Sequence, residues 1–170
     1  MEAIAEAADV AVQTVYFTFG TKDELLREVH GWTVLGDDPA PPREQSWHVA
    51  AMREPDAGRA LSMLTAGIAT LNARIAPMLP VFAAVQQEPA GAIYATSKDL
   101  RRRDMRDLVE QLRSKTPLRR GMTRQRAADL LDFVMGPESY ATLVLDLGWT
   151  QRQWAQWTAE WLARELFRND

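Results

Sequence analysis

The sequence predicts an all-α protein, and three observations lead to that prediction. Apolar side chains recur every three or four residues over most of the 170 residues, which places them on one face of a helix. The breaks between these runs carry Gly, Pro or a helix-capping residue such as Thr or Asp. One run, 142–145, has the composition of a buried strand. It has no partner run to pair with, so we interpret it as helix as well.

Composition excludes several functional classes. The chain is 46% hydrophobic and 25% charged with a net charge of −3, so it is not a uniformly basic nucleic-acid binder, although a local basic face is compatible with this charge. It has no Cys and two His, which argues against disulfide scaffolds, thiolate zinc sites and cysteine nucleophiles. We therefore expect no metal and no cofactor. Because no run reaches the roughly 18 apolar residues of a membrane span and the start lacks a secretory signal, we also expect a cytoplasmic protein without membrane contact.

The first 35 residues read as three helices. Residues 4–8 form a short helix, which Asp9 ends in the left-handed conformation. A second short helix is expected at 11–17. Thr21 then starts a third helix, because Thr21 and Glu24 have the spacing of a capping box.

The turn-forming sequence GDDPAPP at 36–42 separates this region from the rest. Asp56 is the expected cap of a long helix with a regular apolar stripe. Pro77 and Pro80 interrupt that pattern, so the next element is either kinked or separate. Helices are predicted, in chain order, at 45–53, 56–74, 78–87, 93–115, 123–134, 138–147 and 150–167. We therefore predict two parts, a helix-turn-helix region with its linking helix at 1–35 and a helical bundle at 36–170.

Residues 4–26 have the pattern of a helix-turn-helix, whose second helix lies in the DNA major groove. Val15 and Phe19 are four residues apart and are expected to point inward. On the outer surface, Gln13 has an amide that can bond a base edge. Lys22 adds positive charge at the start of the next helix, where backbone N–H groups already favour an anion.

This stretch resembles the N-terminal DNA-binding signature of the TetR family of bacterial transcriptional regulators. The matching positions are Ile4, Ala5, Ala8, Val10, Thr14, Val15, Tyr16, Phe19, Lys22, Leu25 and Leu26. The resemblance implies that Val12, Gln13 and Phe17 face the bases of a double-stranded DNA operator. It implies phosphate contacts for Thr14, Tyr16, Thr18 and Lys22.

The same stretch departs from the family pattern in ways that bear on DNA binding. Asp9 stands where the family usually has Gly, Thr18 replaces a common His or aromatic residue, and Ala11 replaces a Ser or Thr cap, a change that typically costs about 1 kcal/mol. The family's first helix is expected before Ile4, where this sequence has three residues, so we expect an incomplete DNA-binding region. Residues 1–35 carry six acids and two bases, a net charge of −4, which opposes phosphate binding.

For 36–170 the resemblance implies a ligand-binding and dimerisation domain. Met, aromatic and amide side chains in the middle helices are candidates for the wall of an effector pocket. These candidates are Trp47, His48, Met52, Met63, Asn72, Met78, Phe82, Gln86 and Tyr94. The alternative for each residue taken alone is ordinary core packing. The Arg cluster at 101–103 is interpreted as a solvated helix face paired with nearby acids.

The resemblance also implies a homodimer in which the helices at 124–147 and 150–167 form a four-helix bundle with a second copy. The candidate interface residues are Leu130, Val134, Leu143, Trp154, Trp157 and Trp161. The alternative is that the Trp residues fill the core of one protomer. A two-fold dimer would match a palindromic operator.

The chain has no phosphate-binding loop, nucleophile elbow or metal-ligand cluster, so we predict that it is not an enzyme. The main functional hypothesis is a homodimeric DNA-binding repressor, in which a small-molecule effector displaces the helix at 22–35. The second hypothesis is a dimeric ligand-binding or protein-interaction module that is derived from this family and does not bind DNA.

Overall fold

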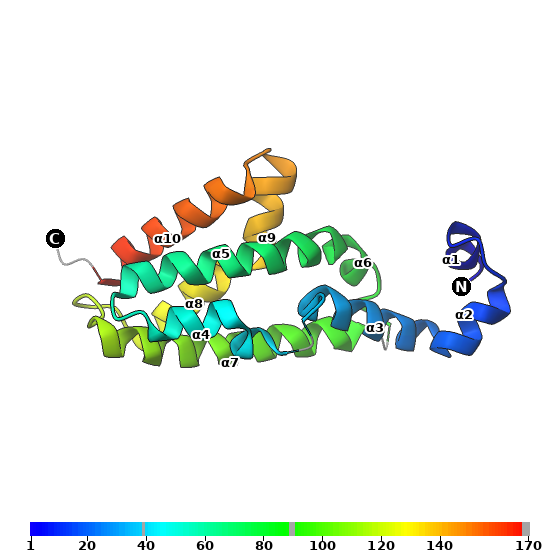
Figure 1. The fold of residues 1–170 in the computed structure, drawn as a ribbon, viewed down its shortest axis with the longest axis horizontal. Helices are drawn as coiled ribbons and strands as arrows, with labels where there is room; N and C mark the ends of the chain where they lie inside the picture. Colours follow the sequence, from blue (N-terminus) through cyan, green and yellow to red (C-terminus); the bar gives the residue numbers. More distant parts are fainter. Residues whose placement is uncertain (39, 89–90, 168–170) are drawn as a thin grey trace.

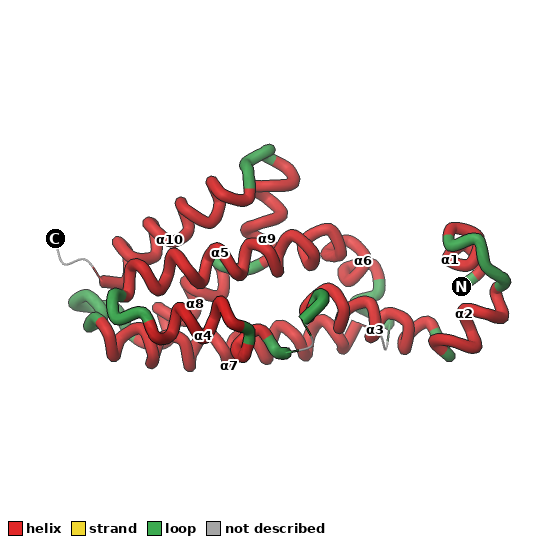
Figure 2. Tube along the Cα trace, viewed as in Figure 1, coloured by secondary structure: helices red, strands yellow, loops and turns green. Residues whose placement is uncertain are grey.

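The computed structural model describes residues 1–38, 40–88 and 91–167, and every regular element in these ranges is a helix. The molecule is elongated (Figure 1). A bundle of helices forms the body at one end, and the two N-terminal helices project at the other. Figure 2 shows that loops occupy little of the chain between the helices. The predicted all-α fold is confirmed.

Three helices make up the N-terminal region: α1 (Glu2–Ala7), α2 (Val12–Phe19) and α3 (Lys22–Leu35). Asp9 has the predicted left-handed conformation, with a φ of 52°. The capping box at the start of α3 is present, since the Thr21 backbone N–H donates to Glu24 Oε2 at 2.8 Å and the Glu24 N–H donates to Thr21 Oγ1 at 3.2 Å. α2 ends at Phe19, two residues later than predicted, because Gly20 with a φ of 69° is the residue that breaks the helix.

The body contains the remaining elements. They are η1 (Pro42–Glu44), α4 (Ser46–Arg53), α5 (Ala57–Ile75), η2 (Ala76–Met78), α6 (Leu79–Ala84), α7 (Gly91–Lys115), α8 (Arg124–Val134), α9 (Pro137–Tyr140), η3 (Ala141–Asp146) and α10 (Gln151–Phe167). Asp56 and Thr123 cap α5 and α8 through their side chains, as predicted. The run at 142–145 is helical and not a strand, although η3 has the wider turns of a π-helix.

The core lies around α5, which packs against α4 and α10. Leu61 and Leu64 of α5 are completely buried, together with Leu131 of α8 and Leu162 of α10. By length and composition, Ala57–Ala84 is the one stretch of the described chain that could span a membrane. Because α5 contributes buried side chains to this core, we interpret that stretch as a core helix.

The linking helix α3 contacts the body at several points along its length. Leu26 packs with Phe82 and Val85 of the α6 region. At the end of α3 the Arg74 guanidinium donates to the carbonyl oxygens of Thr33 at 3.1 Å and Val34 at 3.3 Å. A cation at this position is also favoured by the negative end of the helix dipole. The end of α3 is therefore held directly by the core helix α5.

Candidate functional site

α2 has the two faces that the sequence predicts. Val15 is 5% exposed and packs inward, and Phe19 is half-buried. Phe17 is 94% exposed and Tyr16 is 52% exposed. Gln13, Thr14 and Thr18 are also exposed, whereas Val12 is half-buried. α2 therefore presents one polar and aromatic surface that the rest of the described chain leaves open.

One hydroxyl on this surface is already engaged. Thr18 Oγ1 donates to the Thr14 carbonyl oxygen at 2.8 Å. Its proton is therefore used within the helix, and its oxygen remains free only to accept. A phosphate oxygen needs a donor, so the role implied for Thr18 requires its hydroxyl to turn away from Thr14.

Lys22 is held by the body of the protein. Its Nζ lies 3.3 Å from Oε2 of Glu88, which follows α6, and both side chains are about half exposed. Lys22 is the one cation among the four residues for which a phosphate contact is predicted. The structure thus places an acid from the body against this cation. The sequence holds no local signal for this pair, because the two residues are 66 positions apart.

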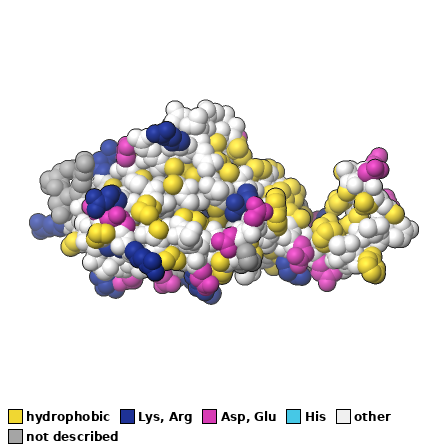
Figure 3. Space-filling model, viewed as in Figure 1, with side chains coloured by type: hydrophobic (Ala, Val, Ile, Leu, Met, Phe, Trp, Pro, Cys, Tyr) yellow, Lys and Arg dark blue, Asp and Glu magenta, His cyan; other side chains and the backbone are white. Residues whose placement is uncertain are grey.

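The charge distribution agrees with the acidic composition of residues 1–35. On the face drawn in Figure 3, Lys and Arg side chains gather mainly over the body, and the projecting end shows hydrophobic and acidic side chains. The positions on α2 that are predicted to face DNA are uncharged. A phosphate-binding surface at this end would rely on Lys22, hydroxyl groups and backbone N–H groups.

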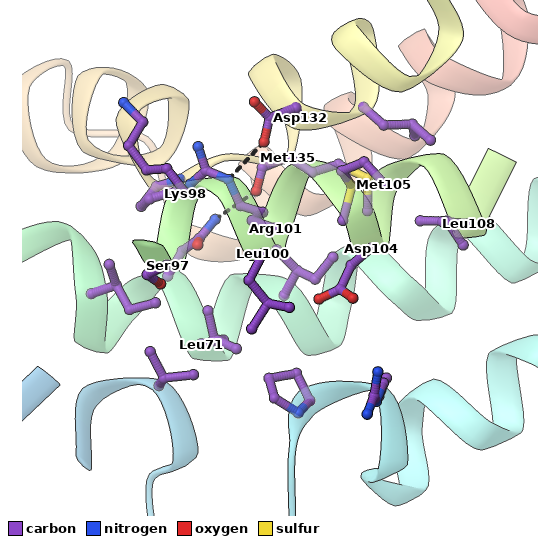
Figure 4. A pocket seen from close by; sticks show the side chains of 18 of the residues that line it. Leu71, Ser97, Lys98, Leu100, Arg101, Asp104, Met105, Leu108, Asp132 and Met135 are labelled. Carbon is purple, nitrogen blue, oxygen red and sulfur yellow. Dashed lines mark hydrogen bonds and ion pairs between the residues drawn. The ribbon is translucent and has the colours of Figure 1, made fainter. Parts of the chain in front are cut away.

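A cavity of about 170 Å³ lies in the body between α3, α4, α5, α7 and α8. Its walls are mostly apolar, with Leu64, Ile68 and Leu71 from α5 and Met105 from α7. Figure 4 shows the α7 side chains around this cavity. α3 contributes His30 and Val34 to the wall, so the helix that begins at Lys22 also borders the cavity.

The predicted pocket residues divide into three groups. Trp47, His48, Asn72 and Tyr94 line the cavity. Phe82 and Gln86 line a second hollow of about 310 Å³ between α6 and α7, which Tyr94 shares. Met52, Met63 and Met78 line neither of the two, which corrects the prediction for these residues. Met63 lies on the exposed face of α5, Met52 packs on the main core, and Met78 packs near Leu26 and Phe82.

Two of the lining residues have structural roles. The Asn72 side chain donates from Nδ2 to the Met135 carbonyl oxygen at 2.9 Å and is buried, so it ties α5 to the end of α8. The Trp47 indole lies directly on Gly67, where an added Cβ would be 2.3 Å from the ring. Trp47 Nε1 donates to Gln45 Oε1 at 2.8 Å. The Trp47 indole can therefore occupy this position in the cavity wall only because residue 67 is Gly and has no side chain.

His30 has an unused polar atom. Its Nε2 is buried without a hydrogen-bond partner among the described residues. The ring meets Phe82 and Tyr94 edge-on, with centroid distances of 5.4 and 6.5 Å. Burial lowers the pKa of His30, which favours the neutral imidazole. A buried polar atom without a partner is costly, so a ligand in the cavity that bonded Nε2 would remove this cost.

An ion-pair network closes one side of the cavity. Arg101 Nε lies 2.7 Å from Asp132 of α8, and its Nη2 lies 3.3 Å from Glu138 of α9. Lys98 and the Tyr94 hydroxyl contact the other Glu138 oxygen at 3.2 and 3.1 Å. Burial alone would raise the pKa of Glu138, but Arg101 and Lys98 outweigh it and hold this pKa below its usual value. Arg101 is thus not on a solvated face, which corrects that interpretation.

The comparisons with known proteins bear on the N-terminal region. Residues 1–29 match the family model described as "Bacterial regulatory proteins, tetR family". This span contains α1, α2 and the first part of α3, the elements whose arrangement is described above. Residues 1–29 are thus similar to the N-terminal region of TetR-family regulators. Searches of curated proteins and of solved structures gave no significant match.

The match supports the interpretation of the α1–α2 unit as a helix-turn-helix of the TetR type, the DNA-binding motif of these transcription regulators. α2 is then the helix that enters the major groove in such motifs. Its exposed face is the surface that carries Gln13, Tyr16 and Phe17. The two faces of α2 thus differ in their surroundings: one packs within the motif, and the other is open to solvent.

The structure corrects part of the prediction for the dimer interface. Trp154 is completely buried, meets Tyr140 at a centroid distance of 5.2 Å and donates from Nε1 to Ser139 Oγ at 3.2 Å. Val134 is 4% exposed. Both residues belong to the core of the protomer, because α5 and α9 cover the side of α10 and α8 on which they lie.

The other candidates of the interface leave some apolar surface accessible. Trp157 is 38% exposed, and Leu130, Leu143 and Trp161 are partly buried. Sequence reasoning missed three more exposed apolar residues in this region, namely Phe133, Leu145 and Leu147. A helical projection from Leu130 could have indicated Phe133, which lies three residues further on the same side.

Proposed function

We propose that the protein is a cytoplasmic, homodimeric repressor that binds a palindromic operator through α2 and releases it when a small-molecule effector enters the cavity. The observation that carries this proposal is the double role of α3. This helix begins at Lys22 beside the DNA-binding motif, and its His30 and Val34 border the cavity. One helix therefore connects the two sites.

The coupling has a simple geometric basis. α3 has 14 residues, which corresponds to a length of about 20 Å. Its C-terminal end is tied to α5 by Arg74. A ligand that pushes on His30 would tilt the helix about this fixed end. The largest displacement would occur at Lys22 and α2, so the two DNA-binding motifs of a dimer would change their separation.

The DNA contacts in this proposal are those implied by the family resemblance. Val12, Gln13 and Phe17 face the bases, and Thr14, Tyr16, Thr18 and Lys22 face the phosphates. For adjacent major grooves on one side of B-DNA, the two α2 helices must lie about 34–36 Å apart. The exposed apolar side chains near Phe133 and Trp157 support a dimer formed through α8 and α10, because a surface of this kind is typical of protein interfaces.

The test is DNA selection followed by titration. A palindrome selected from a random duplex pool would be labelled, and binding would be followed by fluorescence anisotropy. Tyr16→Ala and Lys22→Ala are each expected to weaken binding about tenfold or more, since each removes a charge-assisted or hydroxyl contact to phosphate. Arg103→Ala is the matched control, because it removes an exposed cation from the body. Binding that both α2-side variants leave unchanged would contradict the assigned face.

A dimeric ligand-binding or protein-interaction module without operator binding is the second candidate. The net charge of −4 over residues 1–35 and the Lys22–Glu88 ion pair favour it. The same selection separates the two functions. A pool in which no sequence is enriched, and binding that vanishes near physiological salt, would support the second candidate over the repressor.

A further inference from the structure

The cavity contains one carboxylate that the protein itself does not pair. Asp104 of α7 lines the cavity and is half-buried. Figure 4 shows that Asp104 and Leu100 point away from the side of α7 on which Arg101 meets Asp132. In the part of the chain that the structure describes, no hydrogen bond or ion pair involves Asp104, and Arg43 is the cation whose charge reaches it.

The cations around the cavity already have partners. Arg101 contacts Asp132 and Glu138, and Lys98 contacts Glu138. Arg43 lies 3.6 Å from its neighbour Glu44. An anionic ligand would have to compete with these carboxylates. A cationic ligand would find, in Asp104, a carboxylate that no hydrogen bond or close ion pair engages among the described residues.

The rest of the wall suits an apolar ligand body. α5 contributes Leu64, Ile68 and Leu71, and α4 contributes the Trp47 indole. The aromatic faces of Trp and Tyr also attract cations, and the ammonium of Lys98 already lies 5.6 Å from the ring centroid of Tyr94. In size, about 150 Å³ is enough for a benzene ring, so the cavity matches one ring with a short arm.

Electrostatics agree with this geometry. Burial raises the pKa of Asp104 in spite of the nearby Arg43. The charged form of this side chain is therefore less favourable here than in water. A bound cation would remove part of that penalty, because opposite charges stabilise each other most where water is excluded.

We propose that the effector of this cavity is a mainly apolar molecule with one basic nitrogen, whose ammonium group binds the Asp104 carboxylate while its apolar part lies against α5 and Trp47. The proposal rests on the proposed function in one respect: it takes the cavity to be the effector site. It adds the chemical class of the effector and names the residue that selects it.

The test uses three probes that share a phenyl ring and a short arm: 2-phenylethylamine, 2-phenylethanol and 3-phenylpropionate. Calorimetric titration of the full chain is expected to show the amine binding about tenfold more tightly than the alcohol, the size of effect typical of a hydrogen bond to a charged group. The carboxylate should bind most weakly. This ranking needs no variant, so it remains informative if a substitution impairs folding.

Asp104→Asn keeps the shape of the side chain and removes its charge, so this variant should bind the amine and the alcohol equally. Asp107→Asn is the matched control, because it removes the same charge from an exposed position of the same helix. It should keep the preference for the amine. A preference that survives in Asp104→Asn, equal or tighter binding of 3-phenylpropionate, or no binding of the amine would each overturn the proposal.

The two proposals fail in different ways. In the first case, the amine binds the unmodified chain, fails to bind Asp104→Asn, and does not release the unmodified chain from DNA. This result would contradict the ligand response and support the Asp104 assignment. Release of DNA by the alcohol as readily as by the amine would support the ligand response and overturn the role of Asp104.

Discussion

Neutralising Glu88 should strengthen DNA binding. In the free protein Lys22 Nζ lies 3.3 Å from Glu88 Oε2, and Lys22 is also the proposed phosphate contact at the start of α3. A phosphate that takes Lys22 must share this cation with Glu88 or displace the carboxylate. Glu88→Gln removes the competitor and leaves the cation in place.

The expected gain follows from the exposure of the pair. The Lys22 side chain is 57% exposed and that of Glu88 is 47% exposed. Ion pairs at such exposed positions are typically worth about 0.2–1 kcal/mol. Removing one competing pair should therefore raise the affinity for DNA about 1.4- to 5-fold in each protomer. The gain should shrink as salt is added, because salt screens exposed charges.

The assay is fluorescence anisotropy with a labelled duplex over a series of salt concentrations. Lys22→Gln should lower the slope of log affinity against log salt by about 0.9 for each phosphate contact that is lost. Glu28→Gln is the matched control, since it removes an exposed acid from α3 itself. It measures the general benefit of a less acidic N-terminal region.

The decisive measurement is the double variant. If Glu88 acts through Lys22, then Glu88→Gln in the Lys22→Gln background should have no more effect than Glu28→Gln has. An equal gain with and without Lys22 would refute the reasoning. The benefit would then come from net charge alone and not from the release of one phosphate-binding cation.

Three further predictions concern stability and assembly. Trp154→Ala should lower the free energy of unfolding by about 3–5 kcal/mol, as large core truncations do, and urea unfolding would measure this loss. Trp157→Ala should leave that free energy nearly unchanged and weaken self-association in sedimentation equilibrium; the opposite pattern would contradict the core and surface assignments. Because burial lowers the pKa values of His30 and His48, the unfolded chain binds protons first when the pH falls below about 6.5. The free energy of unfolding should therefore decrease below that pH and be retained above it. His30→Gln should make the free energy of unfolding depend less on pH. If this variant has the same pH dependence as the unmodified chain, the role assigned to His30 is wrong.

Local sequence signals were sufficient for most helices. Thr21 and Asp56 were identified as caps because a capping side chain bonds a backbone N–H only two or three residues away. Asp9 in its left-handed turn was recognised for the same reason. The helical run at 142–145 depended on a more global argument, the absence of a partner strand. Its π-helical form was not predicted, since the helical period alone does not distinguish the two kinds of turn.

Helix periodicity was less informative where a helix has several apolar sides. Trp154 and Trp157 lie three residues apart on α10, and both were assigned to the dimer interface. Only the packing of Tyr140 and α5 decides that Trp154 is buried and Trp157 is accessible. The prediction that Met52, Met63 and Met78 line the pocket was wrong for a similar reason, because a Met side chain suits a core and a pocket wall equally well.

The sequence by itself determined the helical class, the caps and the two faces of α2, with Val15 inside and Phe17 outside. These features arise from interactions between residues that are close in the sequence, so the local spacing of residue types predicts them. The tertiary structure alone decided that Glu88 holds Lys22. Among the described residues, it also decided that His30 Nε2 has no hydrogen-bond partner and that Asp104 lines the cavity without a hydrogen bond or close ion pair. Each of these depends on which distant helices meet, and charge and burial at such contacts follow from the packing of the whole chain.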